Sequence, residues 1–250
     1  MKILKYTKTN KNTYQVILEK ETITLYDEII LKYELLLKKE ISEEEIEKLK
    51  YDNQLLDSYY DSLTILKSKL KSKKELYDLL KKKEYSTTSI DYALTRLEKE
   101  GYLNDLGYAE IYIDKEIQFT LDGPIKIRKK LIDLGIPEEY ISFEKYDSLW
   151  DSRIKKLIEK QIKSNHNKSS KELKNKITNY IFNKGYSFDM ISSVVDSIYI
   201  PIDDSVLIKE KNKLERKLSR KYSGKELEYQ IRNKLYQKGF SKEEIDLLEE

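Results

Sequence analysis

Apolar residues recur at helical spacing along most of the chain, and one such stretch occurs twice. Residues 172–191 and 226–245 share the order Glu-Leu-x3-Ile-x3-Ile/Leu-x2-Lys-Gly-Tyr/Phe-Ser-x3-Ile, with every matched position 54 residues from its counterpart. A related pattern around Leu76 returns around Ile127, 51 residues later. The chain therefore contains four copies of one helical unit. Repeats of this length are typical of stacked helical arrays, which bury one face against their neighbours and expose a long surface for binding.

The middle helix of each repeat has recognisable start and stop signals. A Ser-x-x-Glu sequence predicts a capping box, in which the hydroxyl and the carboxylate satisfy free backbone amides at the helix start. These boxes are Ser72-x-x-Glu75, Ser169-x-x-Glu172 and Ser223-x-x-Glu226, and Gly123-Pro124 takes their place in the second copy. Each middle helix is expected to end at a left-handed glycine. The glycines are Gly135, Gly185 and Gly239, whereas Glu84 occupies this position in the first copy.

Two further helices complete each repeat. A third helix is expected to follow the middle helix directly, started by Ser86, Pro137, Ser187 or Ser241. Leading helices are predicted over residues 55–70, 105–120, 147–163 and 204–220, with Asp105, Asp147 and Asp204 as candidate caps. The four repeats are accordingly assigned to residues 54–103, 104–145, 146–201 and 202–250.

The first 53 residues have a different pattern. Between residues 2 and 26, apolar and polar positions alternate on both sides of a turn at Asn10-Lys11-Asn12, which predicts a small antiparallel meander. A helix is expected from Asp27, with an apolar face formed by Ile30, Tyr33, Leu36 and Leu37. Ser42-x-x-Glu45 predicts the start of a second helix. We therefore expect a mainly α protein, with an N-terminal β-containing module (residues 1–53) and four tandem three-helix repeats in an elongated, curved array.

Composition narrows the class of protein. The 250 residues include 37% charged and 39% hydrophobic residues with only 7 Gly and 3 Pro, which suits amphipathic helices and leaves little room for an all-β fold. Because the formal net charge is only +3, any affinity for nucleic acid depends on local clusters of cations. The N-terminal residues lack the apolar core of a signal peptide, and no stretch is apolar enough to span a bilayer. A soluble cytoplasmic protein without membrane contact is expected.

The sequence offers little catalytic or cofactor chemistry. There is no Cys, and His166 is the only histidine. It lies in the polar link Asn165-His166-Asn167-Lys168, where an exposed loop is a better interpretation than a metal site. No Gly-x4-Gly-Lys-Ser/Thr phosphate loop occurs, so ATP binding by this chain is not expected. We therefore expect no cofactor and no metal, and an enzyme is the least favoured class.

Tyrosines beside basic residues allow two interpretations. Tyr102, Tyr108 and Tyr112 could stack on bases, as aromatic residues do in proteins that bind single strands. Tyr108 and Tyr112, however, lie four residues apart on one helical face, which favours a place in the core of a repeat. Trp150 is also expected to be a core residue, together with Ile154 and Leu157 of the same helix.

Three clusters of cations supply the candidate binding residues. They are Lys69, Lys71, Lys73, Lys74, Lys81 and Lys82 in the first repeat, Lys126, Arg128, Lys129 and Lys130 in the second, and Arg216 and Arg220 in the fourth. One hypothesis is that they contact DNA phosphates or an acidic groove, a contact that would weaken with salt. The other is that they form solvated helix faces in a lysine-rich protein. Both stay open at this point.

One run of residues resembles the RecX family of recombination regulators. It comprises Ser72-Lys-Lys-Glu75-Leu76-x3-Leu80-x2-Lys83-x-Tyr85-Ser86, then Leu94-x2-Leu97-x3-Gly101-Tyr102-Leu103-Asn104-Asp105-x2-Tyr108-Ala109, then Gly123-Pro124-x-Lys126-Ile127-x3-Leu131-x3-Gly135-Ile136. Members of that family are built of tandem three-helix repeats, and longer members have a β-rich N-terminal extension and a fourth repeat. Lys69 and Lys71 stand where the family often has arginine, and lysine keeps the charge but not the planar fork.

The resemblance implies a protein that binds the RecA recombinase in the helical groove of its filament on single-stranded DNA. There it would restrain ATP hydrolysis, strand exchange and co-protease activity, and so act in homologous recombination, DNA repair and the SOS response. A monomer is expected, with single-stranded DNA as a further partner and weaker, salt-dependent binding of double-stranded DNA. One alternative is a module that binds nucleic acid directly without a recombinase, and another is a scaffold for an unrelated protein.

Overall fold

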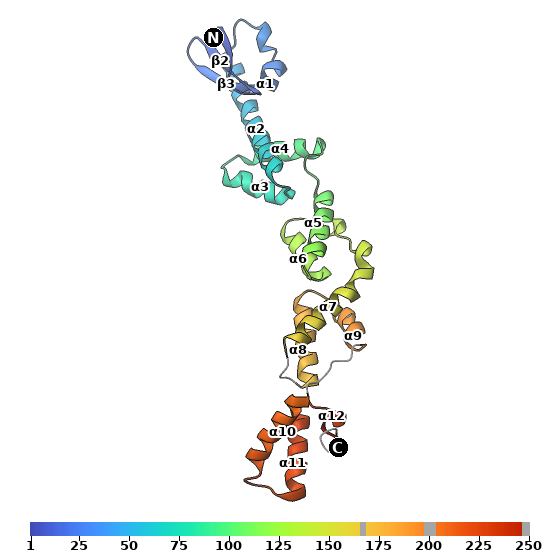
Figure 1. The fold of residues 1–250 in the computed structure, drawn as a ribbon. Helices are drawn as coiled ribbons and strands as arrows, with labels where there is room; N and C mark the ends of the chain where they lie inside the picture. Colours follow the sequence, from blue (N-terminus) through green and yellow to red (C-terminus); the bar gives the residue numbers. More distant parts are fainter. Residues whose placement is uncertain (166–168, 198–203, 247–250) are drawn as a thin grey trace. The chain divides into compact units, whose positions relative to one another are not determined.

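The computed structural model describes residues 1–165, 169–197 and 204–246, without the side chains of Asp204 and Glu243. His166 therefore lies outside the described residues. Twelve α-helices and one three-stranded sheet make up the described part (Figure 1). The expectation of a mainly α protein with a small N-terminal β-containing module is confirmed.

The chain divides into two compact units. One consists of Met1–Ile111 and Leu131–Ile141, and the other of Tyr112–Lys130 and Ser142–Glu250. The division falls within the helices of the second repeat, so each unit is described by itself.

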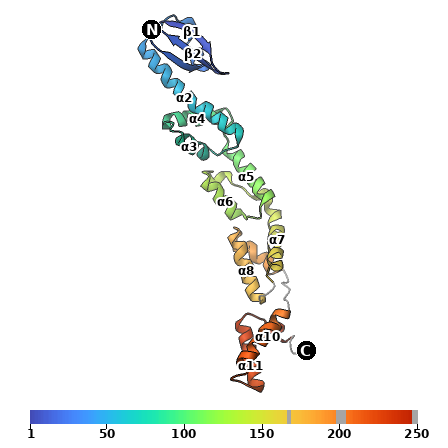
Figure 2. The same cartoon turned by 60° about the vertical axis from the view of Figure 1, so that its left-hand side comes forward.

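The first unit begins with the predicted meander (Figure 2). Strands β1 (Ile3–Lys8), β2 (Thr13–Leu18) and β3 (Thr22–Tyr26) pair antiparallel in the order β1-β2-β3. Alternate residues face the core, and Val16 and Leu25 are completely or almost completely buried. The period-2 pattern of the sequence thus corresponds to one buried and one solvated face of the sheet.

The helix after the sheet is shorter than the sequence predicted. Helix α1 spans Asp27–Lys32, and a separate 3-10 turn covers Leu35–Leu37. Between them Glu34 has a φ of 51°, a left-handed conformation that interrupts the helical path. The expected apolar face is therefore wrong in its second half, since Leu36 and Leu37 are 63% and 82% exposed.

Helix α2 (Glu43–Ser68) joins the N-terminal module to the first repeat. It starts with the predicted capping box, in which the Glu45 amide donates to Ser42 Oγ (3.1 Å) and the Ser42 amide donates to the Glu45 carboxylate (3.0 Å). Its first half packs Ile46 and Leu49 into the core of the sheet, and its second half packs Tyr59 into the core of the first repeat. The predicted boundary between residues 53 and 54 therefore lies inside one continuous helix.

Arg96 connects the module to the first repeat through its side chain. Its guanidinium donates to both carboxylate oxygens of Glu28 (2.8 and 3.1 Å), donates to Glu100 (2.8 Å) and lies 4.0 Å from the centroid of the Tyr59 ring. A bidentate pair of this kind fixes orientation as well as distance. The module and the first repeat are thus held in one arrangement.

The helices of the first two repeats follow with one exception. They are α3 (Lys73–Lys82), α4 (Thr87–Lys99), α5 (Asp105–Phe119) and α6 (Pro124–Asp133). The third helix expected after Pro137 is wrong, because only 3-10 turns form, over Glu138–Tyr140 and Glu144–Leu149. In this segment Ile141, Phe143 and Tyr146 are buried, at a spacing that does not fit one face of an α-helix.

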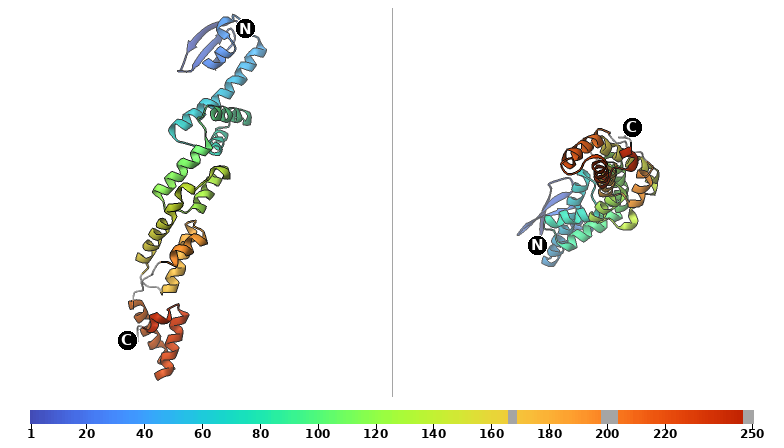
Figure 3. Two further views of the ribbon diagram at one scale, coloured as in Figure 1. Left: turned by 90° about the vertical axis from the view of Figure 1, so that its right-hand side faces the viewer. Right: turned by 90° about the horizontal axis from the view of Figure 1, so that it is seen from below.

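The last two repeats supply the remaining helices of the second unit. They are α7 (Trp150–Lys163), α8 (Ser170–Asn183), α9 (Phe188–Val195), α10 (Asp204–Leu218), α11 (Gly224–Gln237) and α12 (Lys242–Asp246). Figure 3 shows the hairpin of α10 and α11 in red. Its core includes Leu207, Leu214 and Leu235. Trp150 is 5% exposed, so its expected place in the core is confirmed.

Most of the predicted helix starts are confirmed, with three corrections. Ser72, Ser86, Ser169, Ser187 and Ser241 all accept from a backbone amide three residues on. Ser223 makes no such bond, and the next residue, Gly224, has a φ of 54°. Asp105 does not cap α5, because Asn104 Oδ1 accepts from the Gly107 amide (3.0 Å). Asp147 lies within the 3-10 segment before α7, so it is not its cap.

Successive middle helices contact one another end to end. Ser72 Oγ, at the start of α3, donates to the Leu134 carbonyl just after α6 (2.7 Å). The Gly123 amide before α6 donates to the Lys184 carbonyl after α8 (2.7 Å). Ser169 Oγ before α8 donates to the Lys238 carbonyl after α11 (2.8 Å). The free carbonyls of one helix end thus find donors at the start of the preceding middle helix, which fixes the register of neighbouring repeats.

This contact explains the glycines that end the middle helices. Gly135, Gly185 and Gly239 have φ values of 82°, 91° and 89°, as predicted. A Cβ atom on Gly135 would lie 2.6 Å from the Lys74 Cβ, and one on Gly185 would lie 2.5 Å from the Lys126 amide nitrogen. Glycine is therefore required both by the left-handed backbone and by the close approach of the preceding middle helix.

Glu84 is an exception in sequence but not in conformation. Its φ is 65°, in the same left-handed region as the glycines, and its side chain is exposed. The first repeat has no preceding repeat against which this turn would have to pack. A side chain therefore fits here, although the backbone conformation remains unfavourable for it.

Replacing Glu84 with glycine is expected to stabilise the first repeat. Relief of the left-handed strain should outweigh the greater freedom of glycine in the unfolded chain, for a net gain of about 1 kcal/mol. Amide hydrogen exchange in α3 and α4 should slow accordingly. Glu84→Ala removes the same carboxylate but keeps Cβ, so equal slowing in both variants would contradict a backbone origin.

Candidate partner-binding and nucleic-acid-binding surfaces

Half of the predicted cations around α3 are engaged within the protein. Lys71 donates to Glu75 (2.8 Å) with only 18% of its side chain exposed, and so supports the capping box. Lys73 pairs with Glu98 (2.8 Å), and Lys74 donates to the Asp133 carbonyl (2.9 Å). These three contacts stabilise the first repeat and its junction with the end of α6.

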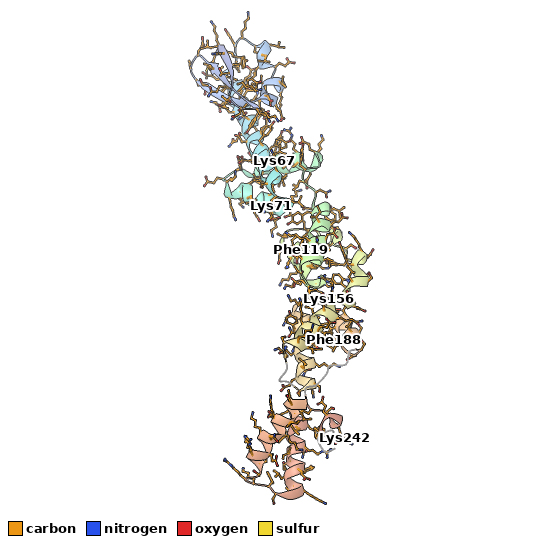
Figure 4. All side chains as sticks on the ribbon, in the orientation of Figure 1. Lys67, Lys71, Phe119, Lys156, Phe188 and Lys242 are labelled. Atoms are coloured by element: carbon orange, nitrogen blue, oxygen red, sulfur yellow. The ribbon has the colours of Figure 1, made fainter. Side chains whose placement is uncertain are left out.

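The other three predicted cations around α3 point to solvent. Lys69, Lys81 and Lys82 are exposed, and no carboxylate of the described residues lies within ion-pair distance of them. Lys81 Nζ lies 5.9 Å from the centroid of the Tyr77 ring. Figure 4 shows the side chains of this region around Lys67 and Lys71. These three lysines are the part of the first cluster that remains available to a partner.

The second cluster surrounds a buried carboxylate. Asp122 is the residue before Gly123, and only 7% of its side chain is exposed. Lys126 (3.2 Å), Lys130 (3.0 Å) and Lys184 (3.3 Å) all contact it, and Lys130 also pairs with Glu116 (3.0 Å). Lys184 belongs to the third repeat, so this cluster joins the third repeat to the second.

The remaining residues of this cluster differ in their surroundings. Arg128 lies over the Phe143 ring, with its guanidinium carbon 5.5 Å from the ring centroid. Lys129 is exposed on α6. Of the four predicted cations of α6, two are therefore structural and Lys129 is the most accessible.

Asp122 should make the stability of this junction depend on pH. Burial by itself raises the pKa of Asp122, but hydrogen bonds from Lys130 and Lys126 outweigh it and hold the pKa below its ordinary value. A lowered pKa in the folded state means stability that is present above the ordinary aspartate pKa of about 3.9 and is lost as pH falls through the folded value.

The free energy of unfolding of Asp122→Asn should therefore lie below that of the wild-type protein at pH 7, with the gap closing below about pH 4. Urea titrations at several pH values, followed by Trp150 fluorescence, measure this gap. Asp151→Asn, at an exposed position of α7, controls for the loss of one negative charge. A gap that stays constant down to pH 3 would contradict this interpretation.

The third cluster is larger than the sequence suggested. Arg216 and Arg220 line an open groove on α10 together with Lys209, Asn212, Lys213 and Lys217, and all six side chains are exposed. Lys209 and Lys213 were not predicted, because they are separated in the sequence from the run of cations around Arg216. The spacing of 209, 213, 216 and 220, which is that of one helical face, would have identified them.

Helix α7 carries a similar but shorter row of cations. Lys156, Lys160 and Lys163 repeat the same spacing, and all three side chains are exposed. Figure 4 labels Lys156. Glu159 lies on the edge of this face, which lowers its net positive charge. The sequence reasoning also missed these three residues.

The tyrosines are divided between core and surface. Tyr108 is buried and donates to Glu75 (3.0 Å), and Tyr112 is half-buried, so the core interpretation is confirmed for Tyr108. Tyr102 is exposed and remains accessible for stacking. In the described residues, no group of three or more His, Cys, Asp or Glu side chains is placed to hold a metal ion.

Known proteins share both this sequence and this fold. Residues 151–195 match the family described as RecX, third three-helix domain. A regulatory protein RecX of Listeria monocytogenes is 30% identical over 245 residues, which cover 94% of this chain and 90% of that protein. The chain belongs to the RecX family. A RecX of Listeria welshimeri is also 30% identical, over 94% of this chain and 90% of its own length, and one of Streptococcus uberis is 29% identical over 91% and 90%.

Solved RecX structures share the fold. A crystal structure of a regulatory protein RecX superimposes with a TM-score of 0.73 at 21% identity, over 78% of this chain and 99% of that chain. The crystal structure of RecX from Lactobacillus salivarius gives a TM-score of 0.54 at 25% identity, over 58% of this chain and 96% of its own. The stretch that matches the third RecX domain lies within residues 146–201, the predicted third repeat.

The residues that carry the RecX resemblance have structural roles here. Leu94, Leu97 and Leu103 are core residues, Gly101 has a φ of 78°, and Asn104 caps α5. The motif therefore identifies the fold of the repeat. Contacts with a partner must come from other, exposed positions.

Along the described residues, no helix combines the length and the apolar character needed to cross a membrane.

Proposed function

We propose that this RecX-family protein binds the RecA recombinase filament on single-stranded DNA and restrains its ATP hydrolysis, strand exchange and co-protease activity. The observation that carries the proposal is the relationship to RecX regulatory proteins over 94% of the chain. The protein would act in the cytoplasm as a monomer, without a cofactor. Binding within the helical groove of the filament is the mode that the family resemblance implies.

The end-to-end contacts between middle helices support a mechanism based on register. Within the second unit, hydrogen bonds from Gly123 and Ser169 connect successive repeats, so exposed residues on these repeats keep a defined spacing. A filament repeats its surface from protomer to protomer. A ligand that contacts several protomers at fixed spacing favours the filament state with the matching spacing and opposes the motions coupled to ATP turnover.

The exposed cations are the proposed contact residues. Those without a carboxylate partner among the described residues, Lys69, Lys81, Lys82 and Lys129, can pair with acidic groups in a protein groove without breaking an ion pair within the fold. The engaged residues Lys71, Lys73, Lys74, Lys126 and Lys130 hold the repeats together, and they are proposed to act only indirectly.

The ATPase activity of RecA on single-stranded DNA tests this proposal. Substoichiometric amounts of the protein should lower the steady-state rate of ATP hydrolysis, and Lys69→Gln/Lys81→Gln/Lys82→Gln should require a higher concentration for the same effect. Lys11→Gln/Lys20→Gln/Lys39→Gln, at exposed positions of the N-terminal module, makes the same change in net charge and should inhibit like the wild-type protein. An unchanged ATPase rate at every concentration would refute the proposal that this protein regulates RecA.

A further inference from the structure

The cationic face of α10 differs from the basic cluster on α6, where two of the four cations are held by carboxylates. Lysines elsewhere commonly contact carboxylates, as at Asp122. On α10, the described residues place no carboxylate within ion-pair distance of Lys209, Arg216, Lys217 or Arg220. Lys213 alone has an acidic neighbour, Glu210, at 3.9 Å. Five cations therefore share one surface with little compensation.

The geometry of the helix concentrates these charges on a single side. The buried residues Leu207 and Leu214 lie on one side of α10, and positions 209, 213 and 216 lie on the other at 100° per residue, with Arg220 in the turn after the helix. Glu210, the acidic residue nearest this face, is turned toward Lys238 just after α11, with which it pairs. This pairing directs the Glu210 carboxylate away from the basic stripe.

The length of the stripe suits a polyanion with regular charge spacing. The helix rises about 12 Å between Lys209 and Lys217, and Arg220 lies in the turn just after the helix ends at Leu218. Phosphates of one DNA strand follow one another at about 3.4 Å along the helix axis, so roughly four of them lie alongside this length. A nucleic-acid backbone can therefore engage the whole stripe at once.

The composition of the stripe argues against a protein partner. Its six lining residues, Lys209, Asn212, Lys213, Arg216, Lys217 and Arg220, include no aliphatic or aromatic side chain. Protein interfaces usually need a buried apolar or aromatic centre for their affinity. Phosphate contacts need only accessible cations and hydrogen-bond donors. The lack of aromatic groups also removes base stacking, the main source of preference for single strands.

We infer that α10 and the turn after it form a binding site for the phosphate backbone of DNA. It consists of Lys209, Lys213, Arg216, Lys217 and Arg220, does not read sequence and does not distinguish single from double strands. This site works without a recombinase and so goes beyond the proposed regulation of RecA. It would hold the protein on DNA next to the filaments on which it acts.

The test compares two triple variants of equal net charge. Lys213→Gln/Arg216→Gln/Arg220→Gln removes three of the five cations, and glutamine preserves helix propensity at the two positions within α10. The control is again Lys11→Gln/Lys20→Gln/Lys39→Gln. Circular dichroism confirms the fold of both. Fluorescence anisotropy with labelled 30-residue single-stranded and duplex DNA of random sequence then measures binding over a series of salt concentrations.

The stripe variant should bind both DNA probes at least tenfold more weakly at low salt, and the slope of log K against log salt should fall by about 2 to 3. The control variant should bind like the wild-type protein. Equal affinities of the stripe variant and the wild-type protein, equal losses in both variants, or wild-type binding to phosphatidylglycerol vesicles but not to DNA would each overturn the inference. Inhibition of the RecA ATPase, measured on the same samples, reports separately on the proposed function.

Discussion

Replacing Gly185 with alanine is expected to cost the protein roughly 2 to 5 kcal/mol of stability, from two sources that act together. The residue has a φ of 91°, so any side chain strains the backbone. The added Cβ would also lie 2.5 Å from the Lys126 backbone nitrogen at the start of α6, where no flexible side-chain end can move aside. The result should be a separation of the second and third repeats at lower denaturant concentration.

Trp150 provides a local reporter for this experiment. It is the only tryptophan, it is buried, and its ring lies 6.1 Å from that of Tyr186, the residue after Gly185. Gly101→Ala is the matched control, because Gly101 has a φ of 78° but a Cβ there would meet nothing within 4 Å. The free energy of unfolding of Gly101→Ala should fall only by the cost of the backbone strain, about 1 to 2 kcal/mol. Equal losses in both variants would show that the end-to-end contact contributes nothing.

Replacing Arg153 with methionine is expected to cost about 3 kcal/mol. Arg153 is 7% exposed, and its guanidinium donates to the carbonyls of Ile117 (2.8 Å), Thr120 (2.7 Å) and Asp122 (3.3 Å). These carbonyls lie at the end of α5 and in the turn before α6. Without the arginine they lose donors that water cannot readily replace at a buried site.

The Arg153 prediction has its own controls. Lys155→Met, at an exposed position of the same helix, should leave the urea midpoint of Trp150 fluorescence almost unchanged. Arg153→Lys keeps the charge but cannot reach three carbonyls with one ammonium group. Its stability should therefore lie between those of the wild-type protein and Arg153→Met. A methionine variant as stable as the wild-type protein would mean that these hydrogen bonds make no net contribution.

The sequence predicted the local features of the fold because their causes are local. A Ser-x-x-Glu box, a left-handed glycine and an apolar face act within one or two helical turns, and Ser72, Gly135 and Ile177 lie where the pattern placed them. The failures have tertiary or conformational causes. Leu36 is exposed because Glu34 interrupts the helix, which no residue pattern signals.

The candidate binding residues were harder to predict for a related reason. Whether a lysine is available depends on carboxylates that are distant in sequence. Lys184, for example, meets Asp122, which lies 62 residues away. Lys130 appeared in the sequence as one of four cations but is enclosed by Asp122 and Glu116. The stripe on α10 is different, because its spacing follows from the helix itself and was present in the sequence.

Co-sedimentation with RecA filaments tests the central claim most directly. Filaments are assembled on single-stranded DNA with a slowly hydrolysed ATP analogue, at a salt concentration that abolishes binding of this protein to bare DNA. The protein should then pellet with the filaments in a saturable manner, and the triple variant of the α10 stripe should do the same. A protein that stays in the supernatant with assembled filaments would contradict its assignment as a RecA-filament regulator.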